Sequence, residues 1–242
     1  MEKMISEEIK KRYEAVCKQV KDAALRANRN PNDVTVLAVT KLQSIEKIKS
    51  AYDAGIRFFG ESYVEEALPK MKTLSGMESA RWEMVGHVQS RKAKLVAASF
   101  SRLHSLSTIK LARLLNRHRD TALSPLEVLI QVNVSGEESK QGVDATKREE
   151  WGNVLKFAQE LKDYPNLKLT GLMSMPPLFD DAELNRSYFR QLRELLHFLN
   201  AKDPSLKLHE LSMGTSYDFV VAIEEGATIV RLGSILLGER QR

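Results

Sequence analysis

Short, mostly β-branched apolar runs alternate with amphipathic stretches along nearly the whole chain, and this alternation limits the possible folds more than any other feature. Several runs are continuously apolar, which is typical of parallel strands whose two faces are both covered. The pattern therefore predicts parallel strands connected by helices. The eight runs are 34–39, 56–60, 82–86, 103–106, 126–134, 167–175, 208–213 and 228–237.

Strict alternation of strands and helices predicts an α/β fold with right-handed crossovers, and eight such units fit a (β/α)8 TIM barrel. We expect residues 1–242 to form a single barrel domain, with an extra N-terminal helix over 4–27 that covers the place after the last strand. An open doubly wound sheet is the alternative, but it needs a glycine-rich loop after its first strand, and 34–44 contains no glycine. The remaining predicted helices are 44–54, with Ser44 as N-cap and Gly55 at its end, 63–72, 90–98, 108–119, 146–162, 183–200 and 217–225.

Composition excludes several classes of protein. The 242 residues include one cysteine, so no intramolecular disulfide framework is possible. No apolar stretch approaches the roughly 18 residues of a membrane span, and the charged N-terminus lacks a signal core. We expect a cytoplasmic protein, as a monomer or weak dimer. The five histidines show no metal-ligand spacing with acids, and no Gly-x-Ser-x-Gly elbow indicates a serine hydrolase.

Positive charge is concentrated in residues 81–119, which hold nine Lys or Arg and a single acid, Glu83. Such a segment can attract nucleic acid or phosphorylated ligands, or it can form the solvated faces of two helices. Because no RNA-binding motif accompanies the charge, nucleic acid is not favoured as a partner.

Lys41 follows the first predicted strand directly, so its stem should be partly buried and its amine should meet the mouth of the barrel. Partial desolvation and nearby cations lower the pKa of an amine, which makes it a nucleophile able to form a Schiff base. The alternative is a surface lysine that merely follows a strand.

The loops after the last two predicted strands place glycine beside serine or threonine, in 211–219 and 231–240. TIM barrels frequently bind phosphate with these two loops, because glycine lets backbone N–H groups approach the anion. Ser216 is also placed to cap the following helix, whose positive end favours an anion.

Arg231 lies within the last apolar run, and period-two alternation puts it on one face with Ile229 and Gly233. A buried arginine needs an acceptor, which could be an acid such as Glu61 or a ligand heteroatom. A lysine amine, a phosphate cradle and an arginine around one cavity suit pyridoxal 5′-phosphate (PLP), which has an aldehyde, a phosphate and a ring nitrogen.

Several motifs resemble the pyridoxal phosphate homeostasis protein family, whose members look like the N-terminal barrel of alanine racemase standing alone. The resemblance implies that Lys41 is linked to PLP and that Arg231 contacts the ring nitrogen. It places Ser62 and His87 around the ring, and it assigns Ser212, Gly214, Ser216, Gly233 and Ser234 to the phosphate. The family typically has Asn where Ser62 stands and Met where Thr215 stands. The motifs are AVTK at 38–41, FGESYVEEA at 59–67, WEMVGHVQSRKAK at 82–94, VLIQVNVSGEESKQG at 128–142, GLMSMP at 171–176, LSMGTSYDFVVAIEEGATIVRLGS at 211–234 and GER at 238–240.

An arginine opposite the ring nitrogen stays protonated and leaves that nitrogen unprotonated, which weakens the ring as an electron sink. By resemblance, alanine racemase also uses a tyrosine from a second domain, and this chain ends about eight residues past Ser234. We therefore expect a carrier or buffer that holds PLP as a Lys41 aldimine and passes it to PLP-dependent apo-enzymes. The alternatives are a standalone amino-acid racemase and a nucleic-acid- or partner-binding barrel in which PLP is regulatory.

Overall fold

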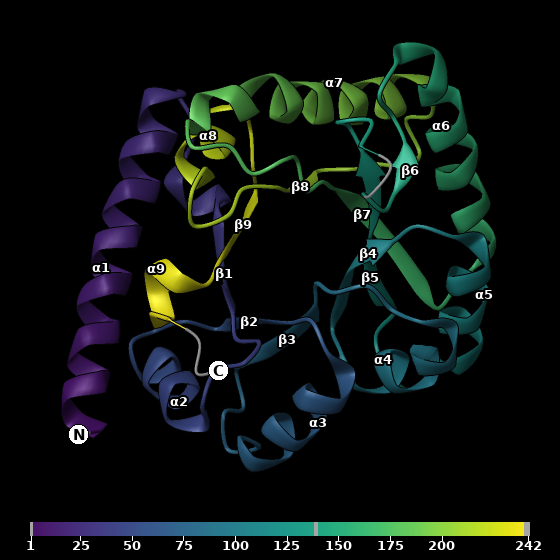
Figure 1. Ribbon diagram of the computed structural model, residues 1–242. Coiled ribbons are helices and arrows are strands. Elements are labelled where there is room, and N and C mark those ends of the chain that lie inside the picture. The colour runs from purple at the N-terminus through teal and green to yellow at the C-terminus, as the bar shows by residue number, and fades with distance from the viewer. Residues whose placement is uncertain (1, 138–139, 240–242) are drawn as a thin grey trace.

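The structure, a computed structural model, describes residues 2–137 and 140–239. Its eight barrel strands are all parallel and form a closed barrel in the order β4-β3-β2-β1-β9-β8-β7-β5, which a pairing between β4 and β5 completes (Figure 1). The predicted (β/α)8 TIM barrel is therefore confirmed. The barrel strands are β1 (Thr35–Val39), β2 (Phe58–Glu61), β3 (Arg81–Met84), β4 (Arg102–Leu106), β5 (Leu126–Asn133), β7 (Leu167–Met173), β8 (Glu210–Ser212) and β9 (Ile229–Leu232).

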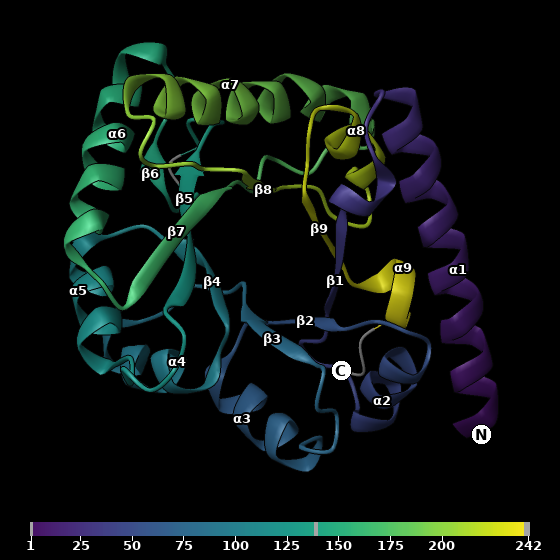
Figure 2. The same ribbon diagram turned by 180° about the vertical axis from the view of Figure 1, so that it is seen from behind.

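Helices surround the barrel as an outer ring, and Figure 2 shows the same ring from behind. The helices are α1 (Glu2–Arg26), α2 (Ile45–Asp53), α3 (Val64–Thr73), α4 (Ala93–Ser99), α5 (Ile109–His118), α6 (Trp151–Glu160), α7 (Arg186–Lys202), α8 (Phe219–Glu224) and α9 (Ser234–Leu237). Short 3₁₀ turns are η1 (Pro31–Asp33), η2 (Ser90–Lys92), η3 (Arg148–Glu150), η4 (Leu161–Asp163) and η5 (Ala182–Asn185).

The residues predicted to begin and end the second helix, Ser44 and Gly55, lie at the two ends of α2. The Ser44 hydroxyl accepts a hydrogen bond from the Lys47 N–H at the helix start. After the last turn, Gly55 adopts a φ of +107°, and the Ile56 N–H reaches back to the Ala51 carbonyl. Glycine takes this left-handed conformation without steric cost, so the chain can turn directly into the next strand.

Helix α1 occupies the place in the ring next to the short α9. It packs against α2, α8 and α9, and it buries Ile9, Val16 and Val20 on that side (Figures 1 and 2). The predicted covering role of the N-terminal helix is confirmed. Predicted strand 228–237 is too long, because the strand ends at Leu232 and residues 234–237 coil into α9.

Two separate apolar groups fill the fold. Leu37, Leu129, Met173 and Ile229 meet inside the barrel, while a much larger core lies between the strands and the helices. This is why several strands read as continuously apolar in the sequence. The short strand β6 (Val143–Asp144), which the apolar pattern did not predict, pairs with β5 outside the closed barrel.

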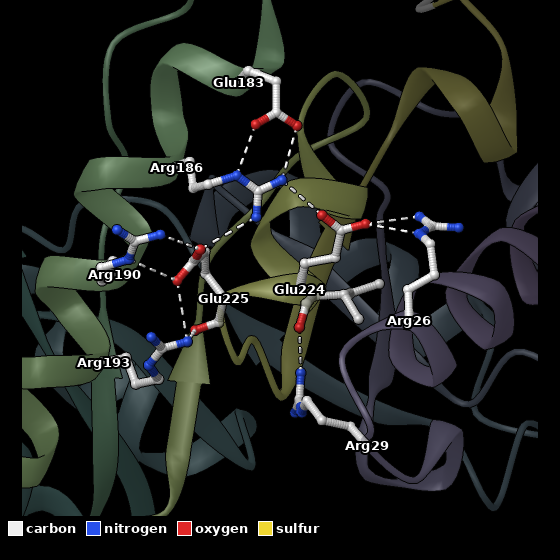
Figure 3. Close-up of polar contacts among 9 residues, drawn as sticks. Arg26, Arg29, Glu183, Arg186, Arg190, Arg193, Glu224 and Glu225 are labelled. Atoms are coloured by element: carbon white, nitrogen blue, oxygen red, sulfur yellow. Dashed lines mark hydrogen bonds and ion pairs between the residues drawn. The ribbon is translucent and has the colours of Figure 1, made fainter.

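Glu225 ties α8 to α7 through three arginines (Figure 3). Its carboxylate is buried and accepts hydrogen bonds from Arg186 and Arg190, and it pairs with Arg193 at 3.1 Å. Arg193 also donates to the Glu225 carbonyl at the end of α8. Burial alone would raise the pKa of Glu225, but the hydrogen bonds from Arg190 and Arg186 and the charge of Arg193 hold it below its ordinary value.

Glu224 connects α8 to α1 in the same cluster (Figure 3). It accepts from Arg26 of α1 on one side and from Arg186 of α7 on the other. Arg29, which follows α1, donates to the Ile223 carbonyl at 2.6 Å. Helix α8 is therefore anchored from both neighbours at its C-terminal end, and this helix separates the loop after β8 from strand β9.

We predict that Glu225→Gln lowers the free energy of unfolding at pH 7 by about 1–3 kcal/mol, because charged hydrogen bonds to three arginines are lost. A carboxyl whose folded pKa is depressed stabilises the fold above its ordinary pKa, and that stabilisation is lost as the pH falls through the folded value. The difference from the wild type should therefore shrink below about pH 4, as chemical denaturation measures.

Glu183→Gln is the matched control for this change, since Glu183 also pairs with Arg186 but is exposed. An exposed ion pair contributes less than about 1 kcal/mol, so this variant should lie close to the wild type. Equal losses in both variants, or a Glu225→Gln difference that persists in acid, would contradict the ion-pair explanation.

Candidate functional site

A cavity of about 1000 Å³ opens at the carboxyl ends of the strands. Its lining brings together seven of the nine predicted site residues, which come from the loops after β1, β2 and β8, from β9 and from the turn into α9 that follows it. These seven are Lys41, Ser62, Gly214, Ser216, Arg231, Gly233 and Ser234. An adjoining pocket of about 570 Å³ shares Lys41 and Ser62 with the first and contains His87.

Lys41 is partly buried in the turn after β1 and lines both cavities, as its position in the sequence predicts. The next residue, Leu42, has a φ of +57°, which is rare and unfavourable for a leucine. The Leu42 N–H donates to a carboxylate oxygen of Glu66 on α3 at 2.6 Å. A strained backbone of this kind persists only where its surroundings hold it, so the contact with α3 defines the geometry of the Lys41 turn.

A buried ion pair between Lys70 and Glu61 holds the turn that contains Lys41. Lys70 of α3 donates to the Thr40 carbonyl at 2.7 Å and to the Glu61 carboxylate at 2.9 Å, and the Thr40 hydroxyl donates to the same carboxylate oxygen. Burial raises the pKa of Glu61 in spite of the opposing charge of Lys70. The sequence named Glu61 as a possible partner of Arg231, but the described contacts pair it with Lys70 and Thr40, so that alternative is wrong.

The loops after β8 and β9 are joined directly. Gly214 has a φ of +90°, and a Cβ there would lie 2.6 Å from the Ala222 Cβ, so the turn needs glycine. The Ser216 hydroxyl accepts a hydrogen bond from the Gly233 N–H at 3.1 Å. The prediction that Ser216 caps α8 is wrong, because the residue before α8 is Asp218 and the Ser216 hydroxyl is used to connect the two loops.

These loops present hydrogen-bond donors that fit an anion. Among the described residues, the backbone N–H groups of Ser216, Tyr217, Ser234 and Ile235 have no acceptor within the protein. Asp218 also lines the cavity, and its carboxylate is occupied within the protein, since it accepts from the N–H and hydroxyl of Thr215 and from the side-chain amide of Asn185. Unpaired N–H groups beside serine hydroxyls are the donor set that phosphate requires, so the loops fit a phosphate group.

Arg231 extends into the barrel below these loops. It is buried, and it donates to the Ser212 hydroxyl at 2.7 Å and to the Ser174 carbonyl at 2.9 Å. Burial lowers the pKa of Arg231 to about 10, with Asp218 opposing the shift, so the guanidinium stays charged at neutral pH. A guanidinium has five N–H donors, and these two contacts leave others for the cavity that Arg231 lines.

Ser212, unlike the other residues that the resemblance assigns to the phosphate, is not among the residues that line the described cavity. It is fully buried and lies outside the described lining of the cavity, with its hydroxyl between Arg231 and the ring of His104. Period-two alternation explains the difference, because Ser212 is a strand residue that faces the barrel interior.

Ser62 follows β2 and His87 follows β3, and the two loops that contain them are in contact. A Cβ on Gly86 would lie 2.2 Å from the Ser62 carbonyl oxygen, so glycine allows the two loops to meet. Ser62 is partly buried and His87 is exposed, and both line the second pocket. They can therefore contact a ligand bound next to Lys41.

The basic segment 81–119 is divided between structural and exposed residues. Arg102 is buried in ion pairs with Glu127 and Glu210, and Arg119 donates to main-chain carbonyls. The remaining exposed cations without a described ion pair lie on η2, α4 and α5, as the solvated-face interpretation predicts. They are Arg91, Lys94, Lys110, Arg113 and Arg117.

Within residues 2–137 and 140–239, no group of three or more His, Cys, Asp and Glu side chains is arranged to hold a metal ion. No helix in these two ranges has the length and apolar character needed for crossing a bilayer.

A parallel barrel with a lysine after its first strand and an anion cradle after its last two belongs to the class of alanine racemase-like barrels. The family described as "Alanine racemase, N-terminal domain" matches residues 15–241 of this chain. Within that class, the chain belongs to the pyridoxal phosphate homeostasis protein family. The protein of that name from Vibrio alginolyticus is 39% identical over 96% of this chain and 97% of its own, and the one from Pseudomonas aeruginosa is 40% identical over 93% of each.

Solved structures agree with this assignment. PipY of Synechococcus elongatus, solved with PLP bound, is 30% identical, covers 95% of this chain and all of its own, and superposes with a TM-score of 0.81. Alanine racemase from Corynebacterium glutamicum superposes with a TM-score of 0.63 at 15% identity, over 93% of this chain and 61% of its own. At that identity the likeness shows the fold alone.

We predict that Lys70→Met destabilises the protein by about 3–5 kcal/mol at pH 8, because it leaves the Glu61 carboxylate buried without a cation. A carboxyl whose folded pKa is raised destabilises the fold as the pH rises above its ordinary value. The loss should therefore decrease as the pH is lowered from 8, because protonation of Glu61 removes the buried charge, and denaturation over a series of pH values measures it.

Lys72→Met, an exposed change on the same helix, is the control and should cost less than about 0.5 kcal/mol. Adding Glu61→Gln to Lys70→Met should recover part of the loss, since the fully buried Glu61 carboxylate is then removed and only the partly exposed Glu66 still lacks Lys70. If the double variant is no more stable than Lys70→Met at pH 8, the buried pair does not have the role described.

Proposed function

We propose that this protein binds PLP in the large cavity, with Lys41 as the residue that holds its aldehyde carbon, and that it acts in intracellular PLP homeostasis. The observation that carries the proposal is the meeting of three groups around one cavity: an amine, a buried guanidinium and two loops with unpaired N–H donors. These groups match the aldehyde, the ring nitrogen and the phosphate of PLP. The names of the relatives and the PLP-bound PipY structure support it.

Each residue has a role that follows from its contacts. Gly214 and Ser216 in the loop after β8, Gly233 after β9 and Ser234 at the start of α9 bind the phosphate through backbone N–H and hydroxyl donors. Arg231 donates to the ring nitrogen and, because it stays charged, keeps that nitrogen unprotonated. When bound, PLP supplies an aldehyde that reacts reversibly with primary amines.

Reversible attachment suits a protein that stores and releases its ligand. The cavity mouth is lined by the partly buried Lys41 and by exposed side chains such as Tyr217, so an incoming amine can reach the linked carbon. We propose PLP-dependent apo-enzymes as recipients of the released cofactor. The racemase alternative has only the shared fold in its favour, and we do not propose it.

Lys41→Ala should abolish covalent retention of PLP while leaving the fold intact, because a lysine at the cavity mouth contributes little packing. Borohydride reduction followed by peptide mass spectrometry measures the attachment, and circular dichroism checks the fold. Lys49→Ala, an exposed change on the neighbouring α2, is the control and should retain the wild-type amount. Persistent trapping at another lysine in Lys41→Ala would show that Lys41 is not the attachment site.

Arg231→Lys should weaken PLP binding by about tenfold or more, since lysine keeps the charge but cannot hold two protein acceptors and a ring nitrogen together. A spectrophotometric titration of the apo-protein with PLP measures the affinity. Arg113→Lys on the exposed face of α5 is the control. An unchanged affinity for Arg231→Lys would remove Arg231 from the site.

A further inference from the structure

A chain of buried hydrogen bonds runs from Arg231 across the barrel interior. Arg231 donates to the Ser212 hydroxyl at 2.7 Å, and that hydroxyl lies 2.8 Å from Nδ1 of His104. Nε2 of His104 lies 2.7 Å from a carboxylate oxygen of Glu83. All four residues lie within the barrel, and both Glu83 and His104 are fully shielded from solvent.

The charge states of these residues determine which atom donates and which accepts in each hydrogen bond. Burial opposes ionisation of Glu83, but the hydrogen bond from His104 and the charge of Arg102 lower its pKa below the ordinary value, so it is a carboxylate and accepts. Burial lowers the pKa of His104, so its ring is neutral and its one proton lies on Nε2, toward Glu83. Nδ1 must then accept from Ser212, whose oxygen accepts from Arg231.

We infer that Glu83, His104 and Ser212 are positioning residues that hold the Arg231 guanidinium in one orientation toward the cavity. The inference rests on the proposed function for its consequence, namely that the remaining N–H donors of Arg231 face the ring of bound PLP. Without the hydrogen bonds through Ser212, Arg231 would retain only the Ser174 carbonyl as a described acceptor.

The position of this chain of hydrogen bonds inside the barrel favours a role in orienting Arg231 over simple packing. The neighbouring barrel interior is filled by apolar side chains, such as Leu37 and Ile229. A buried polar chain at this level costs desolvation, and it is tolerated only because every member has a partner. At the Glu83 end of these hydrogen bonds lies Arg102, which pairs with Glu83 at 3.5 Å and also with Glu127 and Glu210.

Ser212, His104 and Glu83 have the hydrogen-bond connectivity of a hydrolytic triad, but their environment excludes that use. The Ser212 side chain is fully buried, and its oxygen already accepts from Arg231 while its proton is directed to His104. No substrate carbonyl can approach the oxygen, so its role is to orient the arginine.

Nitrogen-15 NMR of the apo-protein tests the hydrogen bonds between Arg231, Ser212 and His104 without any ligand. We expect His104 to be neutral with its proton on Nε2 at pH 7, and the Arg231 Nη groups to rotate slowly. In Ser212→Ala the Arg231 Nη groups should rotate faster, and a purely structural role for Ser212 would not produce that change. An Nδ1-protonated or charged His104, or unchanged Arg231 rotation in Ser212→Ala, would overturn the inference.

A PLP titration tests the consequence. Ser212→Ala should weaken PLP binding by about tenfold or more, because a hydrogen bond to a charged group is lost. Thr170→Val is the matched control, since it deletes another buried hydroxyl that has no described partner, and it should stay within about twofold of the wild type. Equal affinities in the two variants would overturn the inference.

These outcomes separate the inference from the proposed function. If the wild type and Thr170→Val do not attach PLP to Lys41, the proposed function fails, and the NMR result still decides whether the chain orients Arg231. If both attach PLP and Ser212→Ala does so equally well, only the inference fails. Thermal unfolding of each variant shows whether a loss of affinity comes from a loss of fold.

Discussion

The burial of one guanidinium inside an apolar barrel is the constraint on which the site depends. Removing Arg231 from water is costly unless its donors find acceptors, and the strands supply them from the Ser212 hydroxyl and the Ser174 carbonyl. This requirement explains the polar groups that surround Arg231 within an apolar interior. It also gives the cavity a fixed positive group, in a lining that includes the partly buried Lys41.

The groups around the cavity are held by contacts that lie outside it. Lys70 holds the Lys41 turn through Thr40 and the buried Glu61. On the other side, α8 connects the loop after β8 to strand β9, and Glu225 fixes α8 against α7 (Figure 3). The positions of the amine, the anion donors and the guanidinium therefore depend on packing between the barrel and its outer helices, where the large core lies.

The sequence predicted what depends on local pattern and missed what depends on distant partners. Alternation of apolar runs was sufficient for the barrel, and the position of Lys41 after a strand was sufficient to place it at the mouth. Helix α9 was read as strand because its four residues are too few to show a period. The partners of Glu61, and the inward role of Ser212 beside His104, join residues far apart in the chain, so no local spacing signals them.

The most direct test of the account is a crystal structure of the protein grown with PLP. We expect continuous density between Nζ of Lys41 and the aldehyde carbon, with the phosphate between the loops of Gly214 and Gly233 and the ring nitrogen beside Arg231. A structure with PLP bound elsewhere, with these two loops vacant and the Lys41 amine not linked to it, would contradict the account.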